Sequence, residues 1–193
     1  MPLKLISAPA ERAVSLLEAK AHLRVDHADE DALISIFLDA ALAHLDGRDG
    51  VLGRALVTQT WELPLDAFPR DTVIGIPLAP VQSVTSIQYR DAAGALQTFL
   101  AANYVLDAIS EPARIDLAPG ASWPGTQDVP NAVTIRFVAG YGAATTVPPA
   151  LKAAVLLLVG HLYRNREATT AEALAALPMG VDALIAPFRI ISF

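Results

Sequence analysis

The segment at residues 147–167 constrains the fold of this chain more than any other. It opens with Pro148 and Pro149, which suit the first turn of a helix because the N–H that proline lacks would be unpaired there. Residues 153–160 are then apolar at every position. A helix that faces solvent keeps a polar stripe, and this one has none. The pattern therefore predicts a helix that is covered on all sides.

A bilayer does not provide that cover. The apolar run is much shorter than the ~20 residues that a membrane-spanning helix needs, and Lys152, His161, Arg164 and Arg166 bracket it. The cover must be protein, either the rest of the fold or neighbouring copies. The apolar share of 53% and the mean hydropathy of +0.42 exceed the roughly 45–50% apolar content of ordinary domains. This excess favours an assembly whose subunit interfaces hide apolar surface.

Composition excludes several kinds of function. The chain of 193 residues has no cysteine, so disulfides, thiolate nucleophiles and cysteine-bound metals are excluded. Its formal net charge of −6 argues against a surface that clamps nucleic acid, which needs clustered lysine and arginine. The first residues lack the apolar core of a secretory signal, so we expect a protein made and assembled in the cytoplasm.

The chain alternates between helical and strand patterns. Ser15 is expected to cap a helix over residues 16–25, with Glu18 completing a capping box, and a second helix is expected over residues 30–45. After Pro148 the helical pattern returns, then a short helix over residues 171–177 and a further turn over residues 181–185. Alternation between turn signals predicts strands at residues 58–63, 72–76, 84–90, 97–100, 104–107, 114–117 and 132–138.

These patterns predict an α+β fold with three parts. A helical bundle is expected from the N- and C-terminal regions, residues 1–55 and 146–186. A β-rich subdomain is inserted at residues 56–145, and an extended C-terminal tail follows at residues 187–193.

No residue pattern assigns a catalytic, cofactor or metal site. Gly140 and Gly142 follow a predicted strand, but the third glycine of a dinucleotide fingerprint is missing and Val147 to Pro149 separate them from the helix. The four histidines lack zinc-ligand spacing, and no serine lies in a nucleophile motif. Trp123, in a loop of turn-forming residues, is expected either in the core or as an interface anchor.

The acids that precede the second helix allow two interpretations. Asp29, Glu30 and Asp31 stand where a helix dipole favours negative charge, and their spacing does not match a calcium loop. They belong, however, to a stretch from 26 to 49 with seven acids and only Arg48 as a lysine or arginine. In a ring, such a face could line a channel that repels DNA phosphates.

The C-terminal tail is short, extended and apolar by sequence. Such a chain end forms an edge strand of its own sheet or offers itself to a partner's sheet edge. The proline at its start disfavours continuation of the preceding helix. The residues expected to bind a partner are Pro187, Phe188, Arg189, Ile190, Ile191, Ser192 and Phe193.

Several short segments recur in a fixed order along the chain of a known family. They are residues 18–26 (EAKAHLRVD), 29–34 (DEDALI), 60–61 (TW), 80–89 (PVQSVTSIQY), 138–142 (VAGYG), 147–152 (VPPALK) and 177–189 (LPMGVDALIAPFR). This ordered set resembles the head–tail connector (adaptor) proteins of tailed phages and gene transfer agents. The resemblance covers nearly the whole chain from Ser15 onward.

The resemblance implies a structural protein of a virion, without catalysis, metal or cofactor. It implies a ring, usually of twelve copies, that sits under the portal, receives the stopper or tail-completion protein and lets DNA pass. The C-terminal segment would reach the portal. The alternative that remains open is a small enzyme or ligand-binding protein with a site in the β insertion. Direct DNA binding is disfavoured by the charge.

Overall fold

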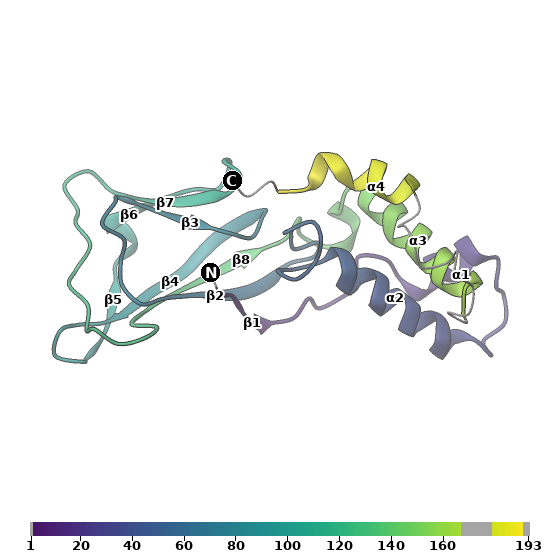
Figure 1. Ribbon diagram of the computed structural model, residues 1–193, viewed down its shortest axis with the longest axis horizontal. Coiled ribbons are helices and arrows are strands. Elements are labelled where there is room, and N and C mark those ends of the chain that lie inside the picture. The colour runs from purple at the N-terminus through teal and green to yellow at the C-terminus, as the bar shows by residue number, and fades with distance from the viewer. Residues whose placement is uncertain (1, 167–178, 191–193) are drawn as a thin grey trace. The chain divides into compact units, whose positions relative to one another are not determined.

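The computed structural model describes residues 2–166 and 179–190. The chain divides into two compact units, each made of two separate stretches of sequence. The first, here called the β unit, consists of Met1–Ala10 and Thr58–Gly140, and the second, the helical unit, consists of Glu11–Val57 and Tyr141–Phe193. The fold is therefore mixed α+β, as predicted from the sequence (Figure 1).

The β unit contains two antiparallel sheets. The larger has the strand order β1-β2-β8-β4-β5 and the smaller has the order β3-β7-β6. Each of the seven predicted strands corresponds to one of β2 to β8, with ends that differ by up to three residues. The strands are β1 (Lys4–Ser7), β2 (Gln59–Leu65), β3 (Val73–Ile76), β4 (Val81–Arg90), β5 (Leu96–Phe99), β6 (Tyr104–Asp107), β7 (Ala113–Leu117) and β8 (Val133–Ala139).

Strand β8 lies at the centre of the larger sheet. Its Phe137 is opposite Trp61 of β2, and its Ile135 is opposite Ile87 of β4. Ile135 and Phe137 are fully buried, whereas Arg136 between them is exposed and pairs with Glu62 at 2.6 Å. The predicted alternation of β8 is thus confirmed.

Strand β1 was not predicted. The sequence interpretation placed residues 1–55 in the helical part, whereas Lys4 and Leu5 pair with Glu62 and Trp61 of β2. Four residues that are all exposed carry no burial pattern that could reveal a strand. Pairing with β2 holds these residues in a strand, since main-chain hydrogen bonds to an edge strand need no particular side chains.

The helical unit is built around α3. Its elements are α1 (Leu16–Leu23), α2 (Asp31–Leu45), the 3₁₀ turn η2 (Ala144–Thr146), α3 (Pro149–Arg164), α4 (Met179–Ile185) and the 3₁₀ turn η3 (Ala186–Phe188). Helix α3 packs against α1, α2 and α4. The helix expected over residues 171–177 lies outside the described residues.

The start of α1 follows the sequence prediction closely. The Ser15 hydroxyl accepts a hydrogen bond from the Glu18 amide at 3.2 Å, and the Glu18 carboxylate accepts one from the Ser15 amide at 2.7 Å. This completes the capping box. The helix ends two residues earlier than predicted, because Arg24 adopts a left-handed conformation (φ 60°) that closes the last turn.

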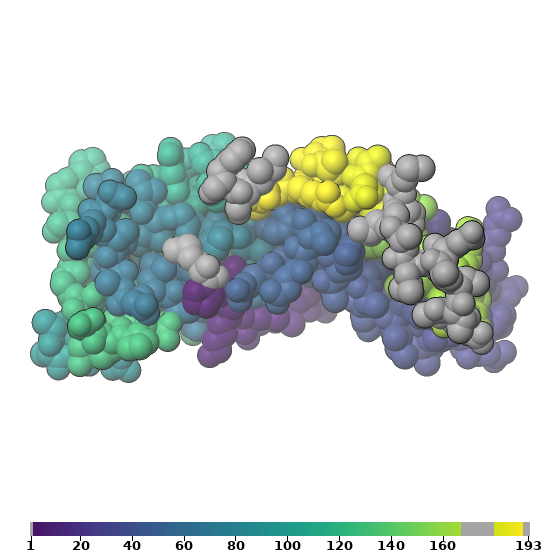
Figure 2. Space-filling model, in the orientation of Figure 1, coloured from purple at the N-terminus to yellow at the C-terminus, as the bar shows by residue number. Residues whose placement is uncertain are grey.

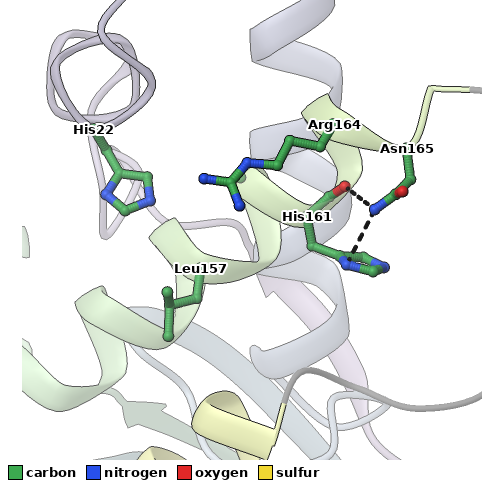
Figure 3. Close-up of a pocket in the computed structure, with 6 residues that line it drawn as sticks. His22, Leu157, His161, Arg164 and Asn165 are labelled. Carbon is green, nitrogen blue, oxygen red and sulfur yellow. Dashed lines mark hydrogen bonds between the residues drawn. The ribbon is translucent and has the colours of Figure 1, made fainter. Parts of the chain in front are cut away.

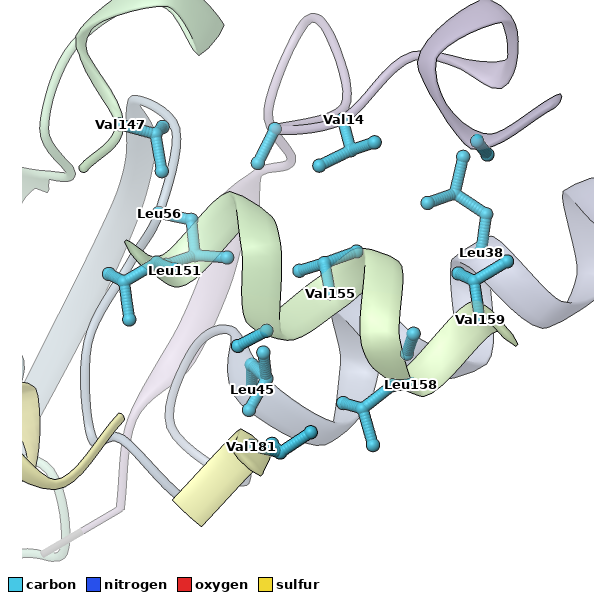
Figure 4. Packing of buried hydrophobic residues seen from close by; sticks show 14 of the residues in the cluster. Val14, Leu38, Leu45, Leu56, Val147, Leu151, Val155, Leu158, Val159 and Val181 are labelled. Carbon is cyan, nitrogen blue, oxygen red and sulfur yellow. The ribbon is translucent and has the colours of Figure 1, made fainter. Parts of the chain in front are cut away.

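The helical core is aliphatic and surrounds α3 on most sides. Leu151, Val155 and Val159 of α3 are fully buried against residues from α2, α4 and the adjoining segments, as Figure 4 shows. Leu157, however, has 37% of its surface exposed. Among the described residues, the single chain thus leaves part of Leu157 exposed, and neighbouring copies are the other cover that the sequence interpretation allowed.

Candidate assembly surfaces

The C-terminal segment is held to the helical unit by a buried arginine. Arg54, only 6% exposed, donates a hydrogen bond from Nε to the main-chain carbonyl of Phe188. The Ile190 amide donates to the carbonyl of Leu52 at 3.1 Å. Arg189 forms an ion pair with Asp182 of α4 at 2.8 Å. Residues 187–190 are thus tied to the helical unit, on the surface coloured yellow in Figure 2.

This arrangement corrects the expectation of a tail that is extended from Pro187. Ala186, Pro187 and Phe188 form the turn η3, and Phe188 packs at the edge of the helical core. The physical reason is that proline suits the first residues of a helical turn, where its missing N–H is not needed. Arg54 then satisfies a carbonyl that the turn leaves open. Ile191, Ser192 and Phe193 lie outside the described residues.

The three acids proposed to line a channel have different surroundings. The Glu30 carboxylate accepts a hydrogen bond from the Tyr163 hydroxyl and pairs with Arg166 at 2.7 Å. These contacts lower the pKa of Glu30, with the Tyr163 hydrogen bond as the main cause, and the same bond raises the pKa of Tyr163.

The other two acids differ sharply in exposure. Asp31 pairs with Lys20 of α1 at 2.5 Å, whereas the Asp29 side chain is 93% exposed, with His27 at 3.6 Å. Glu30 is the N-cap residue of α2, yet its side chain makes no capping hydrogen bond. The acids therefore join α2 to α1 and to the end of α3 more than they cap the helix, and Asp29 alone of the three presents a freely exposed carboxylate.

The two tryptophans lie within the β unit. Trp61 is buried, and its Nε1 donates to Gln59 Oε1 at 3.1 Å. Trp123 is half-buried, stacks on Phe68 with ring centroids 4.9 Å apart, and donates to the Asp71 carbonyl at 2.9 Å. This position agrees with the core interpretation better than with an exposed anchor.

Exposed apolar side chains occur on both units. In the helical unit, Leu17 of α1 is 78% exposed and Ile36 of α2 is 63% exposed, in addition to Leu157 of α3. In the β unit, Ile109 in the turn between β6 and β7 is 94% exposed. Such side chains are candidates for burial between subunits.

The described residues hold no group of three histidine, aspartate or glutamate side chains arranged to bind a metal ion. In the same part of the chain, no helix has the length and apolar content that crossing a membrane requires.

The sequence patterns did not single out Arg54, because a lone arginine between apolar residues gives no sign of the carbonyl that it will meet 134 positions later.

A scan of family models finds no match to this sequence, and neither does a search of the curated proteins. Solved structures, by contrast, include full-length relatives. A chain from the neck of an empty gene transfer agent (GTA) particle, computed with C6 symmetry, has 32% sequence identity and a TM-score of 0.82. The alignment covers 100% of this chain and 97% of that one.

Two further similar chains have the same coverage. One comes from the virion of a native gene transfer agent particle, with 32% identity and a TM-score of 0.80. The other comes from the neck of a native GTA particle computed with C12 symmetry, with 31% identity and a TM-score of 0.79. Similarity of this extent, in both sequence and fold, reaches from one end of the chain to the other. The protein therefore belongs to the head–tail connector (adaptor) family found in gene transfer agents.

Proposed function

We propose that this protein is a structural adaptor that forms a ring of twelve copies in the neck of a phage-like particle. The ring joins the portal to the stopper or tail-completion protein and surrounds the path of the DNA. The observation that carries the proposal is the full-length match to a neck chain at a TM-score of 0.82. The particle is assembled in the bacterial cytoplasm, and the adaptor acts by geometry, without catalysis, metal or cofactor.

A ring accounts for the apolar side chains that one copy leaves exposed. Leu17, Ile36 and Leu157 come from three different helices of the same unit. Heterologous contacts, in which different patches meet, close into a ring when the rotation between copies fits. Necks with C6 and with C12 symmetry, reported for the similar chains, are both compatible with twelve copies.

Contact with the portal is assigned to the C-terminal segment. Because residues 187–190 are tied to the helical unit, they act as the base from which Ile191, Ser192 and Phe193 reach the portal. One short segment binds weakly, but twelve that engage together bind with much higher avidity.

The acids at the start of α2 are assigned to the channel. Asp29 presents a carboxylate to solvent, while the side chains of Glu30 and Asp31 are partly covered by their ion pairs. A net charge of −6 in each copy gives a ring a strongly negative field, and that field keeps DNA phosphates from adhering to the wall.

Imaging of the purified protein with its portal tests the proposal. We expect closed rings seated on the portal in negative stain or cryo-electron microscopy. A protein that stays monomeric in the presence of the portal contradicts the adaptor role.

Truncation after Ile190 tests the tail separately. It should abolish attachment to the portal without changing the helical signal in circular dichroism, because the residues that pack on the helical unit are retained. Normal attachment of the truncated protein would remove Ile191, Ser192 and Phe193 from the portal contact.

A further inference from the structure

Helix α2 is apolar on its outer side as well as on its inner side. On the inner side, Leu38 and Leu45 are fully buried in the core of the helical unit (Figure 4). A helix whose outer side meets water normally carries charged and polar residues there. The exposed positions of α2 are instead Ala32, Ile36, Asp39, Ala40 and Ala43. We call Ala32, Ile36, Ala40 and Ala43 the outer row of α2.

The spacing within the outer row predicts the kind of surface that fits it. Ile36, Asp39, Ala40 and Ala43 stand at positions i, i+3, i+4 and i+7, which are neighbours on a helix surface. In close helix packing, four such residues surround one large side chain of the facing helix. The two alanines leave room for that side chain. The outer row therefore fits a helix that presents a large apolar residue.

The charge on this side of α2 favours contact with a second copy. Asp39 pairs with Arg12 of its own chain at 2.7 Å, and the same guanidinium group donates to the Ser35 hydroxyl at 2.9 Å. A paired carboxylate costs less to bury than an isolated one. Two copies that each carry a net charge of −6 repel one another. They are therefore expected to meet through a surface of low charge, as the outer row is.

Helix α1 presents the large apolar side chain that the outer row requires. Leu17 is 78% exposed, more than any other large apolar side chain described in the helical unit. Ala21, one turn further on, is also exposed. Glu18 between them belongs to the capping box and lies 3.4 Å from the Lys152 ammonium group. Leu17 and Ala21 thus form a short apolar strip on α1.

The exposed Leu157 of α3 has different surroundings. It lines a hollow of about 300 Å³ whose wall includes His22 and Arg164 (Figure 3). Arg24 and Arg164 both line a second hollow, of about 450 Å³. Because cationic side chains line both hollows, Leu157 does not extend the low-charge surface of α2.

We infer that the outer row of α2 packs against α1 of a second copy, with Leu17 of that copy seated between Ile36 and the alanines. The inference rests on the ring proposed above. A heterologous contact joins two different patches of the same chain, and the outer row and the Leu17 strip are two such patches. In a ring every copy has a neighbour on each side, so one repeated contact buries both Ile36 and Leu17.

A carboxylate on the outer row tests this contact. Ala40→Glu should raise the protein concentration needed for ring formation on the portal by about tenfold or more, because the new carboxylate would be buried without a partner. Ala102→Glu is the matched control, since it adds the same charge at an exposed alanine of the 3₁₀ turn η1 (Ala101–Asn103) in the β unit. Rings that form equally readily in the two variants would overturn the inference.

Cysteine cross-linking identifies the helix that meets the outer row. Because the chain has no cysteine, Leu17→Cys combined with Ala40→Cys introduces its only thiols. A short bismaleimide added to assembled rings should join successive copies into a ladder of covalent oligomers, which neither single variant should give. Assembled rings of the double variant without this ladder would overturn the inference. Absence of rings in the wild-type protein would instead overturn the adaptor function itself, so the two failures are distinguishable.

Discussion

The two units of this protein differ in where they use aromatic side chains. The helical unit has a core of alanine, valine, leucine and isoleucine, with aromatic residues only at its margin. The β unit gathers aromatic rings, among them Phe68, Phe99 and Trp123, which lie within 6 Å of one another by ring centroids.

The two groups of side chains also differ in whether a local sequence pattern reveals them. Helix α3 presents its buried row at helical spacing, so each turn adds the next contact. The aromatic cluster instead joins two loops to the end of β5, and its members lie up to 55 positions apart. The buried row of α3 is thus set by local spacing, although α1 and α2, against which it packs, lie more than 100 positions away. The aromatic cluster has no such local row and exists only when the sheet brings distant segments together.

Truncation of one core residue in each unit should show whether the two units unfold independently. Phe137→Ala in β8 should cost about 3–5 kcal/mol, and Leu38→Ala in α2 about 2–5 kcal/mol, because both side chains are fully buried and leave cavities. Hydrogen exchange should show lost protection in the unit that carries the change. Ile36→Ala, at a side chain that is 63% exposed, is the control and should shift stability by less than about 0.5 kcal/mol. Equal loss of protection in both units would show that they unfold as one.

Removal of the Arg54 side chain should loosen the C-terminal segment of the helical unit. Arg54→Ala leaves the Phe188 carbonyl without its donor, at a cost of about 1–3 kcal/mol. The Ile190 amide, bonded to Leu52, should then exchange faster with solvent. Arg48→Ala, which removes an exposed arginine that meets Asp49 only at 3.9 Å, should leave that exchange unchanged. Unaltered protection of Ile190 in Arg54→Ala would mean that the segment is held without Arg54, by Phe188 packing, the bond to Leu52 and the Arg189–Asp182 ion pair.

The aromatic cluster should respond to a smaller change. Trp123→Phe retains a ring that can stack on Phe68 but removes the hydrogen bond from Nε1 to the Asp71 carbonyl. The expected loss is about 0.5–1.5 kcal/mol in chemical denaturation. A larger loss for Trp123→Leu, which also removes the stacking, would separate the two contributions. Identical losses would show that stacking contributes nothing measurable.

Acid should reduce the stability that Asp107 contributes at the turn between β6 and β7 of the β unit. Hydrogen bonds from Ser110 are the main cause that lowers the pKa of Asp107 from 3.8 to about 2. A carboxyl group whose pKa is lower in the folded than in the unfolded chain stabilises the fold at any pH above the unfolded pKa. This stabilisation is lost as the pH falls from about 4 to about 2. Asp107→Asn should remove that pH dependence in acid unfolding, whereas the exposed control Asp128→Asn should retain it. An unchanged acid profile in Asp107→Asn would refute the assignment.

Elements with local signals could be predicted from the sequence. The capping box at Ser15 and Glu18 was predicted because both partners lie within one turn. The alternation of Val133, Ile135 and Phe137 revealed the face of β8 for the same reason. Strand β1 and the turn η3 were not foreseen, because β1 depends on a partner more than fifty residues away and η3 on Arg54.

Some features of the candidate surfaces could likewise be predicted from the sequence, and others could not. The excess of apolar residues was evident in the composition, and it led to the expectation of an assembly. The hollow that Arg24 and Arg164 both line was not evident, because the two stand 140 positions apart and each resembles an ordinary helix-terminal cation.

Among the described residues, the sequence by itself determined the helices and most strands, since hydrophobic period and capping act over a few residues. The full-length resemblance to adaptor proteins was also evident from its ordered motifs. Only the tertiary structure decided which charges are neutralised, which apolar side chains remain exposed and where the C-terminal segment is fastened. Those outcomes depend on pairs of groups that the chain brings together across long sequence distances, and a linear pattern contains no record of such pairs.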